Sequence, residues 1–350
     1  MKIGIPLERK LLEGRIALTP TAVASLVQQG HQLLVEVNAG LKSGYNNQQY
    51  INAGAQIVAD LTMVYSADLI IKVKEPIAEE IQLLRQHQLL FCYLHLAAYP
   101  EVLAGLLTQK TTALAFETLT VDGRLPLLAP MSAIAGRLAM QLAIYYLQQN
   151  NNGMGILLGG VMNTPKGVIV VLGAGVAGSH AAALALAFGA EVYVFDRSEQ
   201  ALAALTEQYP QAHAEIFSET RLAELLPQTD IVIGAILIKG ANAPKVLTQA
   251  LQQLLNKGSI IIDIAIDQGG CVEGIRATDW QQPIYWQAGI GYIAVTNMPG
   301  AVPRTSTQAL SAAILPYVQK IAAGALAIDS ELQSAIAVKD GKVIHSALLI

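Results

Sequence analysis

The stretch from residue 167 to residue 190 constrains the fold of this chain most, because it contains no charged side chain. It divides into the β-branched run VIVVL at 168–172, the turn GAGVAG at 173–178, and the alanine-rich run SHAAALALAFGA at 179–190. This order predicts a buried strand, a tight turn and a buried helix. A membrane-spanning helix would not normally contain several glycines and a histidine, so we favour the strand, turn and helix.

Short apolar runs alternate with helical patterns along most of the chain. The first series has apolar runs at 2–5, 33–37, 68–73, 89–93 and 113–116, and the second has runs at 168–172, 191–195, 214–217, 230–236 and 259–265. The first helical pattern begins after Thr19, which is a good N-cap residue and is followed by a proline. Strands that alternate with helices are typical of parallel sheets. The sequence therefore predicts an α/β protein with two doubly wound, Rossmann-like domains.

The glycines of the turn form the pattern G-x-G-x-x-G, and Asp196 ends the next apolar run. In a dinucleotide-binding fold, Gly173 permits the turn, Gly175 lets the backbone approach a pyrophosphate, and Gly178 lets the helix pack on the strand. Asp196 would accept the adenosine ribose hydroxyls and repel a 2′-phosphate, which favours NAD over NADP. The neighbouring Arg197 tempers this preference, because an arginine can accept the phosphate. A glycine-rich turn with a helix-capping aspartate is the alternative interpretation.

The division into domains follows from two long helical patterns, at 130–150 and about 303–323, which would link the two sheets. We expect a substrate or catalytic domain at 1–128, completed by residues 303–350, and an NAD-binding Rossmann domain at 129–302. The length of 350 residues agrees with two domains. The tail from Ile321 has only a weak pattern, so its structure is left open.

Composition argues against several classes of function. The chain has 22 Lys and Arg against 26 Asp and Glu without a basic run, which argues against nucleic acid or an anionic membrane as partner and leaves a small-molecule substrate. The two cysteines form no CxxC pair, so we expect no disulfide framework and no metal site, and a reducing, cytoplasmic location fits best. The N-terminus lacks the apolar run of a signal peptide.

Polar residues stand just beyond apolar runs, where ligands of open α/β sheets bind. In the first series these are Lys74, His95 and Glu117, which would approach one crevice. Each is a weak indication alone, since a strand-end lysine is usually solvated and a histidine between leucines is often a core residue. In the second series, a strand-end cap is the favoured interpretation of Asp263, whereas Asp267 suits a turn or a functional carboxylate equally well.

Seven segments, in this order and spacing, resemble the alanine dehydrogenase family. They are GIPLERKLLEGRIALTP, IIKVKEP, FCYLHLA, LLAPMSAIAGR, VLGAGVAG, DIAIDQGGC and NMPGAVPRTST, and the resemblance covers about residues 1–320. The N-terminal region of proton-translocating transhydrogenase is related and shares the start and the glycine pattern. It lacks the histidine of LHLA and has a non-acidic residue at the position of Asp267.

The resemblance implies the reversible, NAD-dependent oxidative deamination of L-alanine to pyruvate and ammonia. Arg15 would hold the substrate carboxylate, and Lys74 would bind the carboxylate or polarise the carbonyl oxygen of pyruvate. His95 would be the general acid and base on the carbinolamine and imine steps, and Asp267 would orient ammonia or water. Beyond the three glycines and Asp196, the resemblance places further residues along the NAD site: Ser132, Ala177, Ser218, Ile236, Leu237, Val295, Asn297 and Met298.

Two departures from the family pattern concern the NAD site. Ala133 replaces an acidic residue. Ala201 stands where a basic residue often helps to hold the adenosine, and the absence of that basic residue would weaken NAD affinity. The family is commonly a homohexamer, and we expect a homo-oligomer. Two alternatives stay open: a related dehydrogenase of another amino acid, and a transhydrogenase-like module that binds NAD(H) without turnover of its own. His95 and Asp267 argue against the second.

Overall fold

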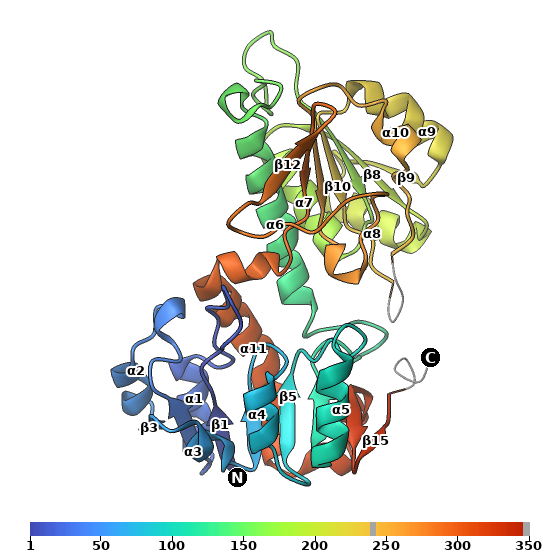
Figure 1. Ribbon diagram of the computed structural model, residues 1–350. Coiled ribbons are helices and arrows are strands. Elements are labelled where there is room, and N and C mark those ends of the chain that lie inside the picture. The colour runs from blue at the N-terminus through green and yellow to red at the C-terminus, as the bar shows by residue number, and fades with distance from the viewer. Residues whose placement is uncertain (239–242, 346–350) are drawn as a thin grey trace. The chain divides into compact units, whose positions relative to one another are not determined.

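The computed structural model describes residues 1–238 and 243–345, and the chain divides into two compact units (Figure 1). Unit 1 is formed by Met1–Met131 and by the chain from Gly300 onward, and unit 2 is formed by Ser132–Pro299. Each described unit is built on one predominantly parallel β-sheet, of eight strands in unit 1 and seven in unit 2. The two doubly wound α/β units confirm the predicted fold class.

The sheet of unit 1 has the order β15-β14-β6-β5-β4-β1-β2-β3. Its parallel strands are β1 (Lys2–Ile5), β2 (Gln32–Glu36), β3 (Gln56–Val58), β4 (Leu69–Ile71), β5 (Leu89–Cys92) and β6 (Thr112–Ala115). The antiparallel strands β14 (Ile336–Lys339) and β15 (Lys342–Val343) extend it beyond β6. The order β3-β2-β1-β4-β5-β6 is that of the Rossmann fold, so the connections change direction between β1 and β4.

Helices cover both faces of this sheet. They are α1 (Pro20–Gln28), α2 (Asn47–Asn52), α3 (Leu61–Tyr65), α4 (Ala78–Leu83), α5 (Pro100–Gln109), α11 (Pro303–Ala322) and α12 (Ser330–Ala335). In Figure 1, α4 and α5 lie on one face and α11 lies on the other. Thr19 is the N-cap of α1, where its side chain accepts from the amide of Ala22, as the sequence predicted.

The sheet of unit 2 has the order β12-β13-β11-β10-β7-β8-β9. Its strands are β7 (Val168–Leu172), β8 (Glu191–Asp196), β9 (His213–Ile216), β10 (Ile231–Gly234), β11 (Ile260–Asp263), β12 (Ile284–Gln287) and β13 (Ile290–Ile293). All pairs are parallel except β12 with β13. The order β9-β8-β7-β10-β11-β13 is again that of a dinucleotide-binding fold, with the change of direction between β7 and β10.

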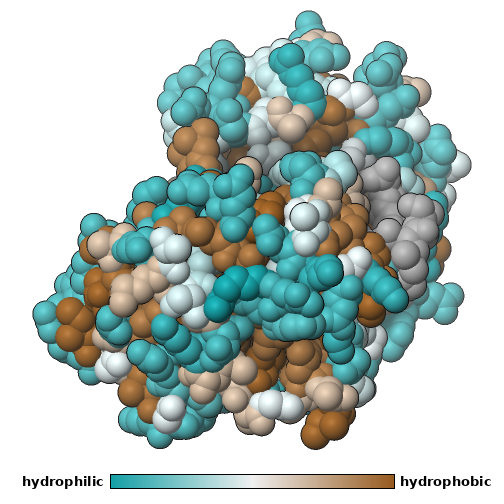
Figure 2. Space-filling view, turned by 60° about the horizontal axis from the view of Figure 1, so that its bottom comes forward, coloured by the Kyte–Doolittle hydropathy of each residue, from teal (hydrophilic) through white to brown (hydrophobic). Residues whose placement is uncertain are grey.

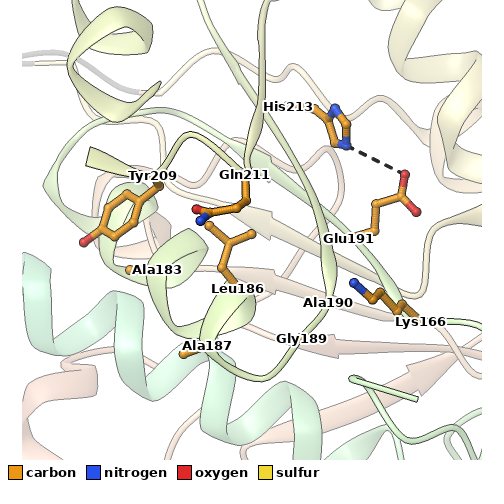
Figure 3. Close-up of a pocket in the computed structure, with 10 residues that line it drawn as sticks. All are labelled: Lys166, Ala183, Leu186, Ala187, Gly189, Ala190, Glu191, Tyr209, Gln211 and His213. Atoms are coloured by element: carbon orange, nitrogen blue, oxygen red, sulfur yellow. Dashed lines mark ion pairs between the residues drawn. The ribbon is translucent and has the colours of Figure 1, made fainter. Parts of the chain in front are cut away.

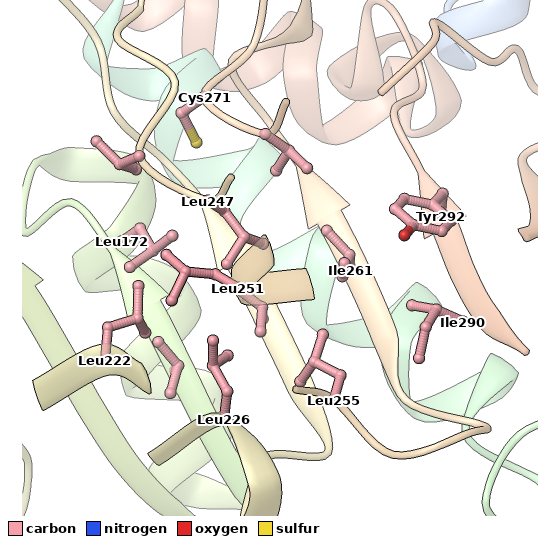
Figure 4. Packing of buried hydrophobic residues seen from close by; sticks show 14 of the residues in the cluster. Leu172, Leu222, Leu226, Leu247, Leu251, Leu255, Ile261, Cys271, Ile290 and Tyr292 are labelled. Carbon is pink, nitrogen blue, oxygen red and sulfur yellow. The ribbon is translucent and has the colours of Figure 1, made fainter. Parts of the chain in front are cut away.

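The helices of unit 2 include α7 (Val176–Ala187), α8 (Glu199–Gln208), α9 (Glu219–Leu225) and α10 (Gln249–Gln252). Helix α6 (Ala129–Tyr146) carries the chain from unit 1 into unit 2, and it ends earlier than the predicted 130–150 because the chain turns into a 3-10 segment, Gln149–Asn151. Leucines from α9 and α10 pack on β7, β10 and β11 in one buried cluster (Figure 4).

The local sequence pattern did not predict five strands that lie at the edges of the two sheets or next to them. These are β3, β12, β13 and the pair β14–β15, of which the last lies in the tail that was left open. β15 has two residues and β3 has three, so neither displays a measurable hydrophobic period. These segments are extended because they pair with neighbouring strands, and their local sequence pattern does not require it.

The exposed surface mixes polar and apolar side chains. In the face drawn in Figure 2, hydrophilic residues surround smaller groups of hydrophobic ones. Exposed large hydrophobic residues include Leu11 and Ile328, and also Leu157, Val161 and Met162, which lie close together in the sequence. Within the described residues, no helix combines the length and apolar character needed to cross a membrane.

The contact between α6 and α7 generates a stability prediction. A Cβ at Gly136 in α6 would lie 2.1 Å from the carbonyl oxygen of Ala177 in α7, so the helices approach each other through a glycine. We expect Gly136→Ala to lower the free energy of unfolding by about 1–3 kcal/mol, because the helices must separate. Urea unfolding measures this, with Gln141→Ala on the exposed side of α6 as control. An unchanged stability in Gly136→Ala would contradict the close packing.

Candidate functional site

The loops that follow β1, β4 and β5 carry the candidate residues of unit 1, at the carboxyl ends of the central strands. Arg15 is buried, and its guanidinium forms a two-pronged ion pair with Glu13: Nε lies 2.7 Å from Oε1 and Nη2 lies 2.6 Å from Oε2. Its Nη1 lies 3.2 Å from Sδ of Met131. Glu13 therefore fixes the orientation of Arg15, and no pattern in the sequence indicated this partner.

Lys74 is held by its backbone and its side chain through two different glutamates. Oε1 of Glu8 accepts from the amide of Val73 at 2.5 Å, and Oε2 accepts from the amide of Lys74 at 3.3 Å. The ammonium of Lys74 lies 4.0 Å from Oε2 of the fully buried Glu75, which also pairs with Lys10. Burial raises the pKa of Glu75, but Lys74 and Lys10 lower it to a net value below the ordinary one. A cationic Lys74 is thus paired with a carboxylate.

His95 lies in the loop after β5 with a left-handed backbone (φ +46°). Glu117, after the neighbouring β6, accepts from the amide of His95 at 2.6 Å and from that of Leu94 at 3.1 Å. The imidazole stacks on the buried ring of Tyr93 at a centroid distance of 5.9 Å, and Nδ1 lies 4.0 Å from Oε1 of Glu117. The side chain is 35% exposed. His95 is therefore no core residue, and its ring is accessible and oriented.

A buried cluster of charges lies beneath these loops. Glu8 contacts Lys72, whose ammonium lies 3.6 Å away and 2.8 Å from Glu80, and all three side chains are buried. Burial raises the pKa of Glu8 to about 7, Lys72 and the amide of Val73 oppose this shift, and Glu13 and Glu80 add to it. Glu8 therefore changes protonation near neutral pH while it supports the backbone at Lys74.

In unit 2, the glycine turn has the conformation that the motif requires. Gly173 has φ +111°, and a Cβ at Gly178 would lie 1.8 Å from the carbonyl oxygen of Gly173. Gly175 is the N-cap of α7, and a Cβ there would meet no atom within 4 Å, so open space lies in front of the backbone at the helix N-terminus. A helix N-terminus with free space is where a phosphate group binds.

Asp196 lies at the end of β8 and ties this turn to the next strand. Its Oδ2 accepts from the amide of Ala174 at 2.7 Å, and its Oδ1 accepts from the amide of Ser198 at 2.8 Å. Both carboxylate oxygens therefore already accept a backbone amide. A ribose hydroxyl would have to donate to their remaining lone pairs. The side chain is half-buried at the edge of the turn. This arrangement fits a dinucleotide, as the motif predicted, and it also assigns Asp196 a structural role.

The other candidate cofactor residues differ in how accessible they are. Ser218 is exposed as the N-cap of α9, Leu237 is exposed after β10, and Ser132, Ala177, Ile236 and Asn297 are half-buried. Val295 and Met298 are buried, with 1% and 3% of their surface exposed. Almost none of the surface of these two residues is exposed, which the sequence could not indicate.

Asp263 and Asp267 have different environments on one loop. Asp263 is buried and accepts from the amides of Ala265, Cys271 and Val272, so its interpretation as a strand-end cap is confirmed. Asp267 is exposed, and its Oδ2 lies 3.4 Å from the amide of Asn297. The structure thus brings Asp267 beside one candidate cofactor residue.

A cavity of about 620 Å³ lies elsewhere in unit 2 (Figure 3). Its lining includes Lys166, Leu186, Tyr209 and His213, and it lies where α7 ends and β8 begins, so it contains none of the candidate residues. Both cysteines are free and buried. In the part of the chain that the structure describes, no cluster of three His, Cys, Asp or Glu side chains could hold a metal ion.

Comparisons with known proteins point to one family. Residues 4–135 match the family described as "Alanine dehydrogenase/PNT, N-terminal domain", and residues 139–346 match "Alanine dehydrogenase/PNT, C-terminal domain". The chain is 42% identical over 354 residues to the alanine dehydrogenase of Bacillus subtilis strain 168, covering 99% of this chain and 94% of that protein.

Solved structures agree with the sequence matches. An L-alanine dehydrogenase superposes with a TM-score of 0.95 at 40% identity, covering 99% of this chain and 98% of the other. A transhydrogenase from Sinorhizobium meliloti superposes with a TM-score of 0.85 at 25% identity, covering 99% of this chain and all of the other. The chain is thus more similar to the first protein than to the second.

The environment of Glu8 generates a prediction on pH and stability. Folding raises the pKa of Glu8 from 4.5 to about 7, so the folded state binds this proton more tightly, and the free energy of unfolding falls as pH rises between these values. In Glu8→Gln this contribution, on the order of 3 kcal/mol, is absent. Urea unfolding from pH 5 to 8 should show a steeper decline in the unmodified protein than in Glu8→Gln.

The control for this experiment is Glu101→Gln, which changes an exposed carboxylate at the start of α5. It should leave the pH dependence of unfolding unchanged. Parallel pH dependences for the unmodified protein and Glu8→Gln would show that Glu8 does not titrate in this range.

Proposed function

The chain belongs to the alanine dehydrogenase/PNT family, and on this premise we propose that it catalyses the NAD-dependent oxidative deamination of L-alanine to pyruvate and ammonia, and the reverse reaction. The observation that carries the proposal is the 42% identity to a curated alanine dehydrogenase over 99% of the chain, together with the oriented Arg15, Lys74 and His95. The chain is an oxidoreductase that acts on an amino acid.

The two units carry different groups of candidate residues. Unit 1 carries the substrate residues Arg15, Lys74 and His95, and unit 2 carries the cofactor residues and Asp267. These units support the proposal of a substrate domain at 1–128, completed by the chain from residue 303, and a cofactor domain at 129–302.

The residues of unit 2 fit NAD, because open space lies before Gly175 at the N-terminus of α7 and Asp196 stands at the end of β8. NAD supplies the hydride acceptor for the Cα hydrogen of alanine. The residues proposed to hold it are Ser132, Gly173, Gly175, Ala177, Gly178, Asp196, Ser218, Ile236, Leu237, Val295, Asn297 and Met298. The carboxylate of Asp196 disfavours the additional phosphate of NADP.

Arg15 and Lys74 bind and orient the substrate. A guanidinium matches a carboxylate through paired hydrogen bonds, and the ion pair with Glu13 keeps that of Arg15 in one orientation. The ammonium of Lys74 attracts the substrate carboxylate or polarises the carbonyl oxygen of pyruvate. Because both cations are held by buried glutamates, little side-chain entropy is lost when the substrate binds.

His95 performs the proton transfers, and Asp267 assists them. An imidazole can take up and release a proton near neutral pH, which suits His95 to the carbinolamine and imine steps. Glu117 orients its backbone, and Tyr93 supports the ring face. Asp267 accepts a hydrogen bond from the attacking water or ammonia and orients it. Positioning of the reactants supplies much of the rate enhancement.

Neither alternative function is favoured. A dehydrogenase of another amino acid would share these residues, since one methylene changes discrimination by only about 1–3 kcal/mol, and a panel of substrates separates the two. A transhydrogenase-like module without turnover is less similar in sequence, as the 25% identity to the Sinorhizobium protein indicates.

Assembly and location complete the proposal. We infer a homo-oligomer, specifically the homohexamer that is common in the family, working in the cytoplasm without nucleic acid or membrane partners. The two free, buried cysteines support a reducing compartment. Light scattering of the purified protein measures the oligomer directly.

The first functional prediction concerns turnover. With NAD and L-alanine at mildly alkaline pH, the purified protein should form NADH, and D-alanine, glycine, serine and lysine should be poorer substrates. His95→Ala should lower kcat by about 10²–10⁴-fold, because a general acid and base contributes that much. Asp267→Ala should also lower kcat strongly. Absorbance of NADH at steady state measures both.

The matched control for His95 is His87→Ala. His87 lies just before β5, at the other end of the same strand, and is also left-handed (φ +62°), but its side chain is 68% exposed and pairs with Asp340. Its loss should leave kcat unchanged. If no amino acid supports NADH formation while the protein binds NADH, the enzyme assignment is wrong and the binding module is correct.

A second prediction concerns the choice of cofactor. Asp196→Asn removes the negative charge but keeps an oxygen for the amide of Ala174. We expect the ratio of kcat/KM for NAD over NADP to fall at least about tenfold, since repulsion of the 2′-phosphate is lost. Glu199→Gln, at the start of α8, is the charge-matched control. An unchanged ratio in Asp196→Asn would mean that Asp196 acts only on the backbone of the turn.

A further inference from the structure

We propose that Lys245 and Asp263 are positioning residues that clamp the loop 264–272 from two sides and so hold Asp267 in its working position. This inference rests on the proposed function, in which Asp267 orients water or ammonia. It assigns a role to a lysine that neither motif nor strand pattern singled out.

Asp263 holds the loop by its amides. Its Oδ1 accepts from the amide of Ala265 at 2.9 Å, and its Oδ2 accepts from those of Cys271 at 2.7 Å and Val272 at 3.0 Å. The residue is completely buried at the end of β11. One carboxylate therefore joins the first residues of the loop to the last ones.

Lys245 holds the same loop by its carbonyl groups. Its ammonium donates to the carbonyl oxygens of Gly269 at 2.5 Å, Gly270 at 2.8 Å and Val272 at 3.2 Å. The two glycines have φ +83° and +70°, a left-handed conformation that other residues rarely adopt. An ammonium has three protons, so three carbonyl acceptors satisfy it fully.

The backbone around Lys245 is itself anchored to the end of the loop. Leu247 pairs with Val272 in a parallel bridge, and the carbonyl oxygen of Cys271 accepts from the amide of Val246 at 2.9 Å. Leu247 and Cys271 are completely buried and belong to one hydrophobic cluster (Figure 4). The backbone of Lys245 is therefore fixed relative to the end of the loop that its ammonium contacts.

The two clamps also support each other electrostatically. Burial raises the pKa of Asp263, whereas the three amides and the positive charge of Lys245 oppose the shift. Without Lys245, the buried carboxylate would take up a proton more readily and would lose part of its capacity to accept from the amides. The lysine thus acts on the loop both directly and through Asp263.

Asp267 needs such support because it is exposed and lies on a glycine-containing loop. It is exposed in the 3-10 turn Ile266–Gln268, directly before two glycines, and its Oδ2 lies 3.4 Å from the amide of Asn297. A glycine-containing loop without anchors would sample many conformations. A displacement of about 1 Å in a group that positions reactants can cost about 10²-fold in rate.

The test uses the full-length protein with Lys245→Met, which keeps an unbranched side chain one atom shorter and removes the charge. We expect kcat with L-alanine to fall at least about tenfold, while the Kd of NADH, from its fluorescence, and the Tm stay near those of the unmodified protein. Lys245→Arg should recover part of the rate. Hydrogen exchange over 264–272 should become faster in Lys245→Met. Lys166→Met, an exposed lysine before β7, is the control.

A double-mutant cycle with Asp267→Asn separates positioning from other roles. If Lys245 acts through Asp267, the double variant should be no slower than Asp267→Asn alone. Additive losses, or full activity in Lys245→Met, would overturn the proposal, as would equal losses in Tm and NADH affinity. Asp263→Asn serves as a second variant. Its kcat is calculated per folded molecule, because this substitution can also lower the fraction of folded protein.

The outcomes distinguish this inference from the proposed function. If the unmodified protein forms no NADH with L-alanine, the proposed function fails. If the unmodified protein is active and Asp267→Asn is equally active, the enzyme assignment stands and the clamp has nothing to position, so the inference is wrong.

Discussion

Carboxylates that accept backbone amides hold four of the candidate loops of this protein in place. Such loops follow parallel strands, and their amides have no sheet partner, so a buried or half-buried acceptor must replace water. The four acceptors and the segments they hold are Glu8 with 73–74, Glu117 with 94–95, Asp196 with 174 and 198, and Asp263 with 265, 271 and 272. In each case the carboxylate lies at or just beyond the end of a strand.

This arrangement follows from the strand order. Glu8 follows β1 and holds the loop after β4, Glu117 follows β6 and holds the loop after β5, and Asp196 ends β8 and holds the turn after β7. Each of these pairs of strands is adjacent and parallel, so their carboxyl ends coincide. The fold thereby couples the positions of the functional loops to the register of the sheets, and it leaves Lys74, His95 and Gly175 oriented before any ligand binds.

The sequence predicted the central strands, the cap of α1, the glycine turn and the strand-end polar residues, because each depends on local pattern. It did not predict β3, β12, β13, β14 or β15, which depend on pairing with distant segments. The partners Glu13 and Glu75 were also missed, since charged residues near the start of a chain or after a strand are usually solvated. The roles of the candidate site residues stay predictions.

By itself, the sequence determined the α/β class, the position of the dinucleotide turn at 173–178 and the family, since these follow from periodicity, glycine spacing and motif order. Only the tertiary structure decided that His95 is accessible, that Val295 and Met298 are buried, and that Lys245 reaches the carbonyl groups beside Asp267. Burial and hydrogen bonding between residues far apart in the chain depend on how strands and helices pack, and no local pattern contains that information.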